Sequence, residues 1–360
     1  MTRPDASTSD RTVLRRHPER GSSDAASIVA VLDEALVVHV AAATERGPLV
    51  LPMAFARKGT TLYLHGAAKN GLFAALVASG EVCVCATLLD GMILAKSAFH
   101  HSMNYRSVVV FAEPRVVEDG DEKRLALDAI VEHALPGRAN ESRRASDGEL
   151  TATLVLAVDL TTASAKTRTG PAIDASPDLP LPYWAGVLPT RLAAEPALPG
   201  TSAGSIPESA VAFALAHAPR LGGEQRIGDI VIDSDPRRID VDRVVGWLAD
   251  ESYWATDMTR ERFADSVAGA FLVGAYTDKG EQVGFARVVT DAITMAWLGD
   301  VFVAASHRDR GIGKALVSFC LDHPRLVGVR KWLLGTRDAH ELYRRHGFTD
   351  IPLGRFMVRP

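Results

Sequence analysis

The sequence predicts two domains, an N-terminal antiparallel β-barrel and a C-terminal α+β domain. Its 360 residues exceed the size at which one hydrophobic core usually suffices. The first half holds many short β-rich runs and few helical ones, a pattern typical of antiparallel barrels. The second half places a buried strand, a loop with two glycines and an apolar helix in succession. A Pro/Ala-rich stretch at residues 191–226 separates the halves as a predicted linker.

Composition and charge exclude several classes of protein. A hydrophobic content of 47% and a charged content of 23% are those of a soluble globular protein. A net charge of -4 without a Lys/Arg-rich run argues against nucleic acid as the main partner. No apolar segment is long enough to span a bilayer, and the N-terminus lacks the apolar core of a signal peptide. Cys83, Cys85 and Cys320 form no Cys-x-x-Cys pair, so we expect neither a metal site nor disulfides, and a cytoplasmic location.

The elements of the first domain follow from periodicity and turn signals. Residues 1–24 are polar and are predicted to be flexible, and the barrel is predicted over residues 25–190. Ile28, Val31, Leu32 and Leu36 have helical spacing. The predicted strands are Ala35–Ala42, Leu49–Arg57, Thr60–His65, Glu81–Leu89, Ser107–Val117, Leu150–Asp159 and Thr161–Arg168. The predicted helices between them are Asn70–Ser79 and Asp121–Leu135, and Pro171–Thr190 is predicted to close the barrel.

Several segments of this half are similar to a known family. They are Val31–Ala35, Leu62–Gly66, Thr87–Gly91, Ser97–Val108 and Pro182–Val187. They resemble split-barrel flavin-binding proteins related to pyridoxamine 5'-phosphate oxidase. The resemblance implies a split β-barrel that binds FMN, whose phosphate is held by basic and hydroxyl side chains near strand ends. Carried over by position, the phosphate contacts are Lys69, Asn70, Tyr105, Arg106 and Ser107. A homodimer through the barrel domain is a further expectation.

Other interpretations of the barrel stay open. Lys69 and Arg106 can supply the charge that a phosphate needs, but both can equally be plain surface charges. His100 and His101, together with His65, suggest a metal or haem site. Adjacent residues on a strand face opposite sides, so His100 and His101 cannot both ligate one metal easily. No residue offers a convincing acid or nucleophile, so redox chemistry would belong to a cofactor. The barrel can therefore also be a ligand-binding or regulatory module without redox activity, or bind haem.

The second domain is predicted over residues 227–360, after a linker with a short helix at Ser209–Ala218. Predicted helices are Val241–Leu248, Thr259–Ala268 and Asp338–His346, and predicted strands are Phe271–Tyr276, Val283–Val289, Trp297–Val303, Lys331–Gly335 and Phe356–Val358. Between strand and helix stands the pattern Arg308-x-x-Gly311-x-Gly313. Glycines there leave backbone amides bare at a helix N-terminus, which favours a pyrophosphate. An ordinary tight turn is the alternative.

This pattern, followed by Ala339-His-Glu-Leu-Tyr343-Arg-Arg-His-Gly-Phe348, resembles the GCN5-related N-acetyltransferase (GNAT) family. The resemblance implies an acetyl-CoA-dependent acyltransferase that acts on a small-molecule or peptide amine. It implies that acetyl-CoA is bound by Val301, Val303, Arg308, Asp309, Arg310, Gly311, Ile312, Gly313, Lys314 and Thr336. Thr336 stands where the family often has Asn, which puts that one contact in doubt.

Two residues are the catalytic candidates. Tyr343 lies where the family places a tyrosine general acid, and a phenol stays protonated at neutral pH. It can instead be a helix tyrosine that packs on the sheet. Asp300 is the candidate for orienting or deprotonating the amine, or else simply pairs with an arginine or backbone group. Tyr253 and Trp254 can wall the acceptor pocket or belong to the core. A chain that is only an interaction scaffold would not need the glycine loop.

Overall fold

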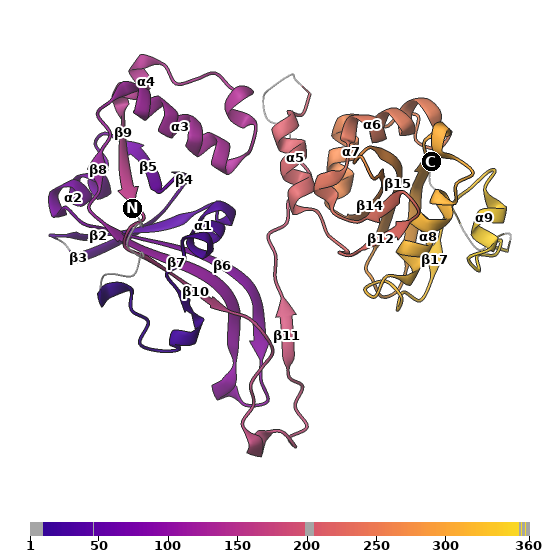
Figure 1. The fold of residues 1–360 in the computed structure, drawn as a ribbon, viewed down its shortest axis with the longest axis horizontal. Helices are drawn as coiled ribbons and strands as arrows, with labels where there is room; N and C mark the ends of the chain where they lie inside the picture. The colour runs from indigo at the N-terminus through magenta and orange to yellow at the C-terminus, as the bar shows by residue number, and fades with distance from the viewer. Residues whose placement is uncertain (1–9, 46, 199–204, 353, 355–356, 358–360) are drawn as a thin grey trace. The chain divides into compact units, whose positions relative to one another are not determined.

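The computed structural model describes residues 10–45, 47–198, 205–352, 354 and 357. The chain divides into two compact units, Met1–Leu192 and Ala193–Pro360 (Figure 1). Each unit has hydrophobic core clusters of its own. No helix among these residues is both long and apolar enough to cross a membrane.

The N-terminal unit is built from two antiparallel sheets. Its strands are β1 (Gly21–Ser22), β2 (Val38–Thr44), β3 (Gly47–Met53), β4 (Phe55–Lys58), β5 (Thr61–Ala67), β6 (Val82–Leu94), β7 (Ser102–Ala112), β8 (Arg115–Val116), β9 (Thr153–Asp159), β10 (Ala163–Arg168) and β11 (Gly186–Pro189). The larger sheet has the order β1-β10-β7-β6-β2-β3, with β11 also paired to β6. The smaller sheet has the order β4-β5-β9-β8. This arrangement confirms the predicted antiparallel split barrel.

Side chains alternate between the two faces of each strand, and this alternation lets the two sheets share one core. From the larger sheet, Val40, Val84 and Val108 point inward, and Leu62 and Leu156 meet them from the smaller one. Helices α1 (Ala25–Glu34) and α2 (Gly71–Ser79) add further apolar side chains to the same cluster. The alternate residues of the smaller sheet pack against α3 (Gly120–Ala134) in a second cluster. Both faces of the smaller sheet are therefore buried.

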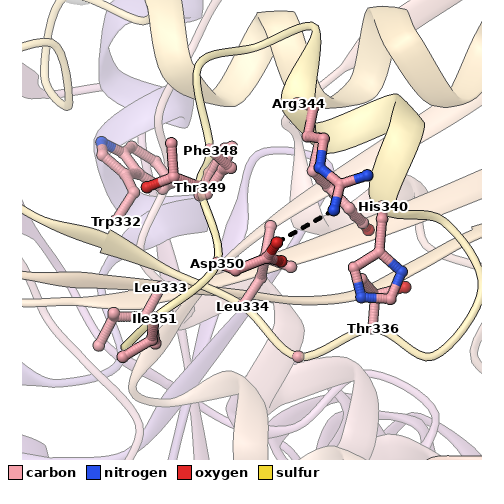
Figure 2. Close-up of a pocket in the computed structure, with 12 residues that line it drawn as sticks. Trp332, Leu333, Leu334, Thr336, His340, Arg344, Phe348, Thr349, Asp350 and Ile351 are labelled. Atoms are coloured by element: carbon pink, nitrogen blue, oxygen red, sulfur yellow. Dashed lines mark hydrogen bonds and ion pairs between the residues drawn. The ribbon is translucent and has the colours of Figure 1, made fainter. Parts of the chain in front are cut away.

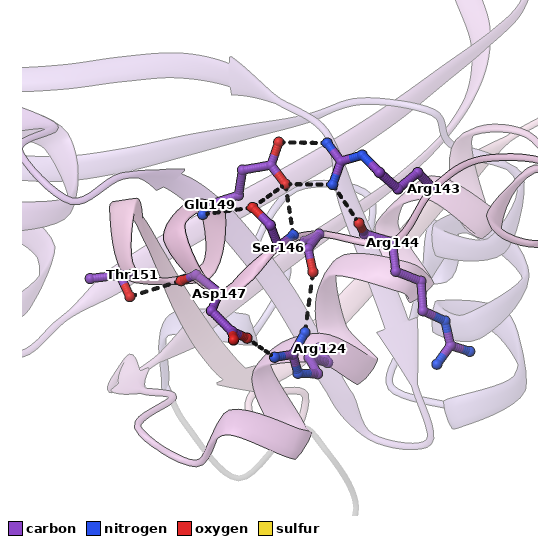
Figure 3. Close-up of polar contacts among 8 residues, drawn as sticks. Arg124, Arg143, Arg144, Ser146, Asp147, Glu149 and Thr151 are labelled. Atoms are coloured by element: carbon purple, nitrogen blue, oxygen red, sulfur yellow. Dashed lines mark hydrogen bonds and ion pairs between the residues drawn. The ribbon is translucent and has the colours of Figure 1, made fainter.

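Helix α4 (Asp147–Ala152) replaces the first residues of the predicted strand Leu150–Asp159. Ser146 and Glu149 form a capping box, in which each side chain bonds to the backbone amide of the other (Figure 3). Arg143 donates two hydrogen bonds to the same Glu149 carboxylate. This local hydrogen bonding starts a helix in a stretch whose apolar residues have strand spacing.

The segments on either side of the barrel are more ordered than the sequence predicts. The N-terminal part, predicted to be flexible, pairs with β10 through β1, and the Arg11 guanidinium lies over the Phe111 ring. Residues 1–9 of that prediction lie outside the described part of the chain. In the predicted closing extension, β11 pairs with the second half of β6.

The C-terminal unit is a single sheet with helices on both faces (Figure 1). Its strands are β12 (Glu224–Ile227), β13 (Ile230–Asp233), β14 (Ala270–Thr277), β15 (Gln282–Thr290), β16 (Ala296–Val303) and β17 (Trp332–Leu333), in that spatial order. Its helices are α5 (Glu208–His217), α6 (Val241–Gly246), α7 (Arg260–Val267), α8 (Ile312–Asp322) and α9 (His340–Arg344). All neighbours are antiparallel except β16 and β17. This mixture confirms the predicted α+β domain.

The two faces of this sheet have separate cores. Helix α8 packs on one face, where Ile312 and Leu316 meet Val288 and Leu298. On the other face lie α5, α6 and α7. Helix α5 falls within the predicted linker 191–226, yet it contributes buried residues to this core. The predicted strand Phe356–Val358 lies outside the described residues apart from Met357.

The edge of the sheet opens where β16 meets β17. The two strands pair only at Ala296–Trp332 and Trp297–Leu333, although β16 continues to Val303. A bulge shifts the β15–β16 register between Phe285 and Arg287. Opposite it, Asp300 has φ 54, a left-handed conformation that few residues other than glycine adopt. Among the described residues, the second half of β16 therefore has no strand partner on the β17 side.

Candidate functional site

The glycine loop forms an amide cluster at the start of α8. Gly311 caps the helix with φ 77, and Asp309 is also left-handed with φ 60. The first loop-to-helix hydrogen bond runs from the Ala315 amide to the Gly311 carbonyl. Within the described residues, the backbone amides of residues 309–314 make no hydrogen bond. Such a run of bare amides, at the positive end of a helix, is a favourable place for an anion.

Glycine matters differently at the two loop positions. Gly311 needs its positive φ, which an L-residue would adopt only with strain. At Gly313 a Cβ would lie 3.7 Å from Val303 Cγ2 and 3.8 Å from Leu342 Cδ2, which is ordinary contact. Alanine therefore fits at position 313, whereas a longer side chain would extend over the free amides.

The cationic side chains of the loop have different partners. Arg310 makes two hydrogen bonds to the Asp229 carboxylate, at 2.6 and 2.8 Å, which ties the loop to the β12–β13 turn. Arg308 donates from Nε to the Val303 carbonyl at 3.1 Å. Lys314 is exposed and has no ion pair among the described residues. Lys314 and the terminal nitrogens of Arg308 are thus the charges left for an anion at the loop.

Two adjoining cavities continue from this loop along β16. The smaller, about 400 Å³, is lined by Val301, Val303 and Arg308 among others. The larger, about 660 Å³, contains both Asp300 and Tyr343. They share the lining residues Tyr253, Trp254, Val301, Arg337 and Asp338, so they lie side by side along β16. The structure therefore brings both catalytic candidates to one cavity beside the expected strand contacts.

Strand alternation shows which face of the sheet the larger cavity occupies. Ala296 and Leu298 of β16 pack into the α8 core, so Trp297 and Gly299 point to the opposite face. Both line the cavity, together with Met258 from the segment between α6 and α7. The larger cavity thus opens on the face of the sheet that carries α6 and α7. Tyr343 reaches it from α9, past the splayed ends of β16 and β17.

Tyr343 belongs to the core and also lines the larger cavity, and its role as a general acid stays a prediction. Its ring packs edge-on against Phe348 and belongs to the α8 core, with 9% of the residue exposed. Burial, and to a smaller degree Tyr253 and Asp338, raises its pKa to about 12. The phenol is therefore protonated across the neutral range and can act as a hydrogen-bond donor in the cavity.

Asp300 is engaged by two neighbours. Its Oδ2 lies 2.7 Å from Arg287 Nε as an ion pair, and Trp254 Nε1 donates to its Oδ1 at 3.2 Å. Only 7% of its side chain is exposed. This pairing is the arginine partner that the sequence left open, and the part of Asp300 in deprotonating an amine stays a prediction.

A further pocket lies beside α9 and shares Gly335, Thr336 and Tyr343 with the larger cavity. Its volume is about 240 Å³, and it is bordered by β17, α9 and the segment 348–351 (Figure 2). Arg344 crosses its mouth to Asp350 in an ion pair at 3.0 Å. Thr336 reaches this pocket too, but its hydroxyl already accepts from the Ala339 amide at 3.0 Å. The Thr336 contact to acetyl-CoA stays a prediction.

In the N-terminal unit the expected phosphate contacts lie in two separate places. Lys69 is exposed and Asn70 caps α2, accepting from the amides of Leu72 and Phe73. Tyr105, Arg106 and Ser107 follow one another on β7 of the larger sheet. No contact among the described residues joins the two groups.

Arg106 is held by two carboxylates. It donates to Asp90 at 2.7 and 3.0 Å and to both oxygens of Glu34, which raises its pKa. Its charge is therefore balanced within the protein. Ser107 Oγ makes a long bond of 3.4 Å to the Lys166 carbonyl. Whether these residues touch a phosphate stays a prediction.

Two arginines, Arg168 and Arg287, were not predicted as site residues from the sequence. Arg168 at the end of β10 is 7% exposed, and its hydrogen bonds go to neutral oxygens, those of Asn104 and Pro171. Burial and the nearby Arg20 lower its pKa, and no carboxylate of the described residues pairs with it. Arg287 is the other. For Arg287 the available signal was an arginine within an otherwise apolar or neutral strand run, whereas the strand of Arg168 also carries Lys166 and gave no such signal.

The candidate haem or metal histidines are not clustered. His100 and His101 each bond through Nδ1 to Ser97, at 2.7 and 3.0 Å. His65 lies on β5, and its buried Nδ1 has no hydrogen-bond partner. Burial lowers the pKa of His65, so the ring is neutral near pH 7. In the described part of the chain, no three acidic, histidine or cysteine side chains gather as a metal site.

Comparisons with known proteins give matches for both units. A family model for pyridoxamine 5'-phosphate oxidase matches residues 24–167, and one for the acetyltransferase (GNAT) family matches residues 241–348. A solved structure, the flavocytochrome Anf3 from Azotobacter vinelandii, is 32% identical. The alignment covers 56% of this chain and 96% of that chain, with a TM-score of 0.54.

Two further relatives match the acetyltransferase part. A GNAT-family structure from Xanthomonas campestris pv. campestris is 36% identical over 38% of this chain and 95% of that chain, with a TM-score of 0.36. A curated protein from Gibberella zeae, named as an acetyltransferase, is 25% identical over 140 residues, which are 33% of this chain and 78% of its own length. The chain thus has an N-terminal unit of the pyridoxamine 5'-phosphate oxidase family, over residues 24–167, and a C-terminal unit of the GNAT acetyltransferase family, over residues 241–348.

Proposed function

We propose that the C-terminal unit is an acetyl-CoA-dependent N-acetyltransferase and that the N-terminal unit binds FMN. The observation that carries the acetyltransferase proposal is the run of unbonded amides at residues 309–314, in the loop directly after Arg308, which lines the smaller cavity. It supplies donors for a pyrophosphate without the need for a metal ion. Lys314, in the first turn of α8, and Arg308, just before the loop, add positive charge on either side of these amides.

The cleft then positions the thioester arm. From the loop, Val301 and Val303 border the smaller cavity, and the missing β17 partner leaves backbone groups of β16 free for the arm. The arm would end in the larger cavity, beside Tyr343. The acceptor amine enters on the α6 and α7 face, where Tyr253 and Trp254 form part of the wall.

Transfer needs a neutral amine and a donor for the departing sulfur. The amine nitrogen forms a bond to the acetyl carbon while the carbon–sulfur bond breaks, and the thiolate then takes a proton. Tyr343, with its pKa raised to about 12, is the donor that we propose. Asp300, which is held by Arg287 and Trp254, orients the amine directly or through a water molecule.

For the N-terminal unit, the support is the family and one structural feature. The Azotobacter relative is a flavocytochrome, and the pyridoxamine 5'-phosphate oxidase family model spans the barrel. The covered Arg168 lies opposite Tyr105 on the neighbouring strand, which brings an uncompensated cation beside the proposed phosphate contacts. FMN would supply hydride or electron transfer, and the chain's own residues would bind and orient it.

A haem group is the second candidate for the barrel, favoured by the flavocytochrome relative and by the unbonded Nδ1 of His65. The visible spectrum of the purified chain separates the two. Flavin released on denaturation would support the first candidate, and a haem spectrum lost on replacing His65 would support the second. A barrel that takes up neither group would be a non-redox module.

The acetyltransferase proposal is tested at Gly313. Gly313→Glu places a carboxylate over the free amides, so acetyl-CoA binding measured by calorimetry should be lost. Gly313→Ala is the matched control, because its Cβ meets only ordinary contacts. We expect the alanine variant to bind within a few-fold of wild type. Unchanged affinity in the glutamate variant would mean that the loop is only a turn.

A further inference from the structure

The larger cavity contains an arginine whose position is fixed on one side only. Arg287 projects from β15, a strand whose neighbouring residues Ala286 and Val288 are fully buried. Its Nε faces Asp300 Oδ2 at 2.7 Å, and these two atoms are sealed from solvent. The ion pair holds the guanidinium plane against the floor of the cavity.

The other edge of that guanidinium is free. Neither terminal nitrogen of Arg287 donates a hydrogen bond to any described residue, and neither is sealed as Nε is. With 19% of the side chain exposed, this edge faces the cavity that Arg287 lines. Two parallel N–H donors in one plane match the two oxygens of a carboxylate.

The charges around Arg287 agree with a carboxylate. Arg337 lines the same cavity, and its guanidinium stacks 3.9 Å above the Tyr253 ring without an ion pair in the described chain. Of the acids lining the cavity, Asp300 is paired to Arg287 and Asp257 to Arg262. Asp338 is the remaining acid in the lining, and it can attract the cationic form of an amine. One anionic and one cationic group on the ligand would balance these charges.

The walls of the cavity are aromatic. Trp254 and Trp297 are 43% and 44% exposed, although both rings are held in place. Trp254 is fixed by its bond to Asp300, and Trp297 stacks beside the backbone of Gly299 and Gly335. Half-exposed tryptophans on a cavity wall favour a flat apolar ligand.

From these features we propose that the acceptor is an amino acid with an apolar, preferably aromatic, side chain. The inference rests on the proposed acetyl transfer. Its carboxylate takes the free edge of Arg287, its side chain packs on the two tryptophans, and its amine points toward Tyr343. The amine forms the new bond to the acetyl carbon, the sulfur leaves, and the product is an N-acetyl amino acid. A polyamine would instead place extra cations beside Arg287 and Arg337.

The test compares acceptors that differ only in the carboxylate. The full chain is given acetyl-CoA with phenylalanine, its carboxamide or phenethylamine, and tryptophan with the matching pair, and thiol release is followed. A charge-assisted bidentate contact predicts that kcat/KM for the acid exceeds that for the amide by about 10–100-fold. The comparison is stringent, because the amide has the lower amine pKa and offers more neutral amine. Equal use of acid and amide, or a preference for spermidine, would overturn the inference.

Variants test whether Arg287 causes the preference for the acid over the amide. Arg287→Gln combined with Asp300→Asn removes both charges together, so no lone buried ion is left. The ratio of kcat/KM for the acid to kcat/KM for the amide should then fall to near one. Acetyl-CoA affinity, which reports whether the loop is folded, should stay within a few-fold of the wild-type value. Arg226→Gln removes a surface arginine that, like its partner Asp278, lies outside the cavity lining, and it should leave the ratio unchanged. A ratio that survives loss of Arg287 would also overturn the inference.

The two proposals fail in different ways. If amines of every kind are acetylated without regard to the carboxylate, acetyl transfer stands and only the acceptor class is wrong. If the chain does not bind acetyl-CoA, the proposed function fails and the acceptor class fails with it.

Discussion

Tyr343 is the residue where packing and catalysis meet. Replacing it with Phe removes only the hydroxyl and keeps the ring against Phe348. A general acid predicts a fall in kcat of about 10²–10⁴-fold with unchanged acetyl-CoA affinity. The measurement is steady-state kinetics on the best amine acceptor, with calorimetry for the cofactor. Turnover of the Phe variant within about twofold of wild type would leave Tyr343 a packing residue only.

The raised pKa of Tyr343 predicts how the stability of the fold changes with pH. Its pKa is about 12 in the folded chain against 10.0 in the reference state, so folding strengthens proton binding. The stabilisation from the buried neutral phenol is therefore complete below pH 10, and it is lost as the pH rises toward 12. Turnover should accordingly show no falling limb from Tyr343 between pH 7 and 10. The Phe variant is the control, since it lacks this transition.

Single residues could be proposed from the sequence where a motif fixed their spacing. Gly311 and Gly313 were recognisable because the pattern stands between a strand and a helix. Partners were not recognisable, because Asp300 meets Arg287 and Trp254 only after the sheet has formed. In the same way Arg106 could be proposed for a phosphate, while its pairing with Glu34 and Asp90 depends on tertiary contacts.

At the scale of elements, Asn70 connects the start of α2 with the proposed flavin site. Its side chain accepts from the first amides of the helix, so Asn70→Ala should cost about 1 kcal/mol of stability. Asn70→Asp keeps the cap but adds a negative charge. If a phosphate binds here, the Asp variant should hold flavin more weakly than wild type while its unfolding in denaturant is unchanged. Equal flavin content in wild type and the Asp variant would confine Asn70 to capping.

Elements with clear periodicity were predicted close to their bounds, and those set by local hydrogen bonds were not. Helix α8 and strands β14 and β15 follow from apolar spacing. Helix α4 depends on the Ser146 capping box, whereas α5 (Glu208–His217) confirms the short helix predicted at Ser209–Ala218 within the linker. The bulge at Asp300 has no signature in the sequence, because its left-handed backbone is imposed by the neighbouring strand.

At the scale of the whole molecule, the two-domain organisation follows from chain length and from two unrelated patterns. Each unit closes its own core, with Leu62 and Leu156 central to one and Leu316 and Phe285 to the other. What the sequence could not supply is the cleft, since the opening between β16 and β17 is a property of the assembled sheet. The same holds for the aromatic wall that Trp254 and Trp297 form.

Separate cores predict separate responses to ligands. Acetyl-CoA binds only the folded C-terminal unit in our proposal, so it should raise the unfolding temperature of one calorimetric transition. At a ligand concentration about 100 times Kd, the expected stabilisation is about 2.7 kcal/mol. FMN should act on the other transition alone. Gly313→Glu should abolish the acetyl-CoA shift and keep the FMN shift, which makes each ligand the control for the other. A single transition that both ligands move together would contradict independent units and would indicate that the two sites are coupled.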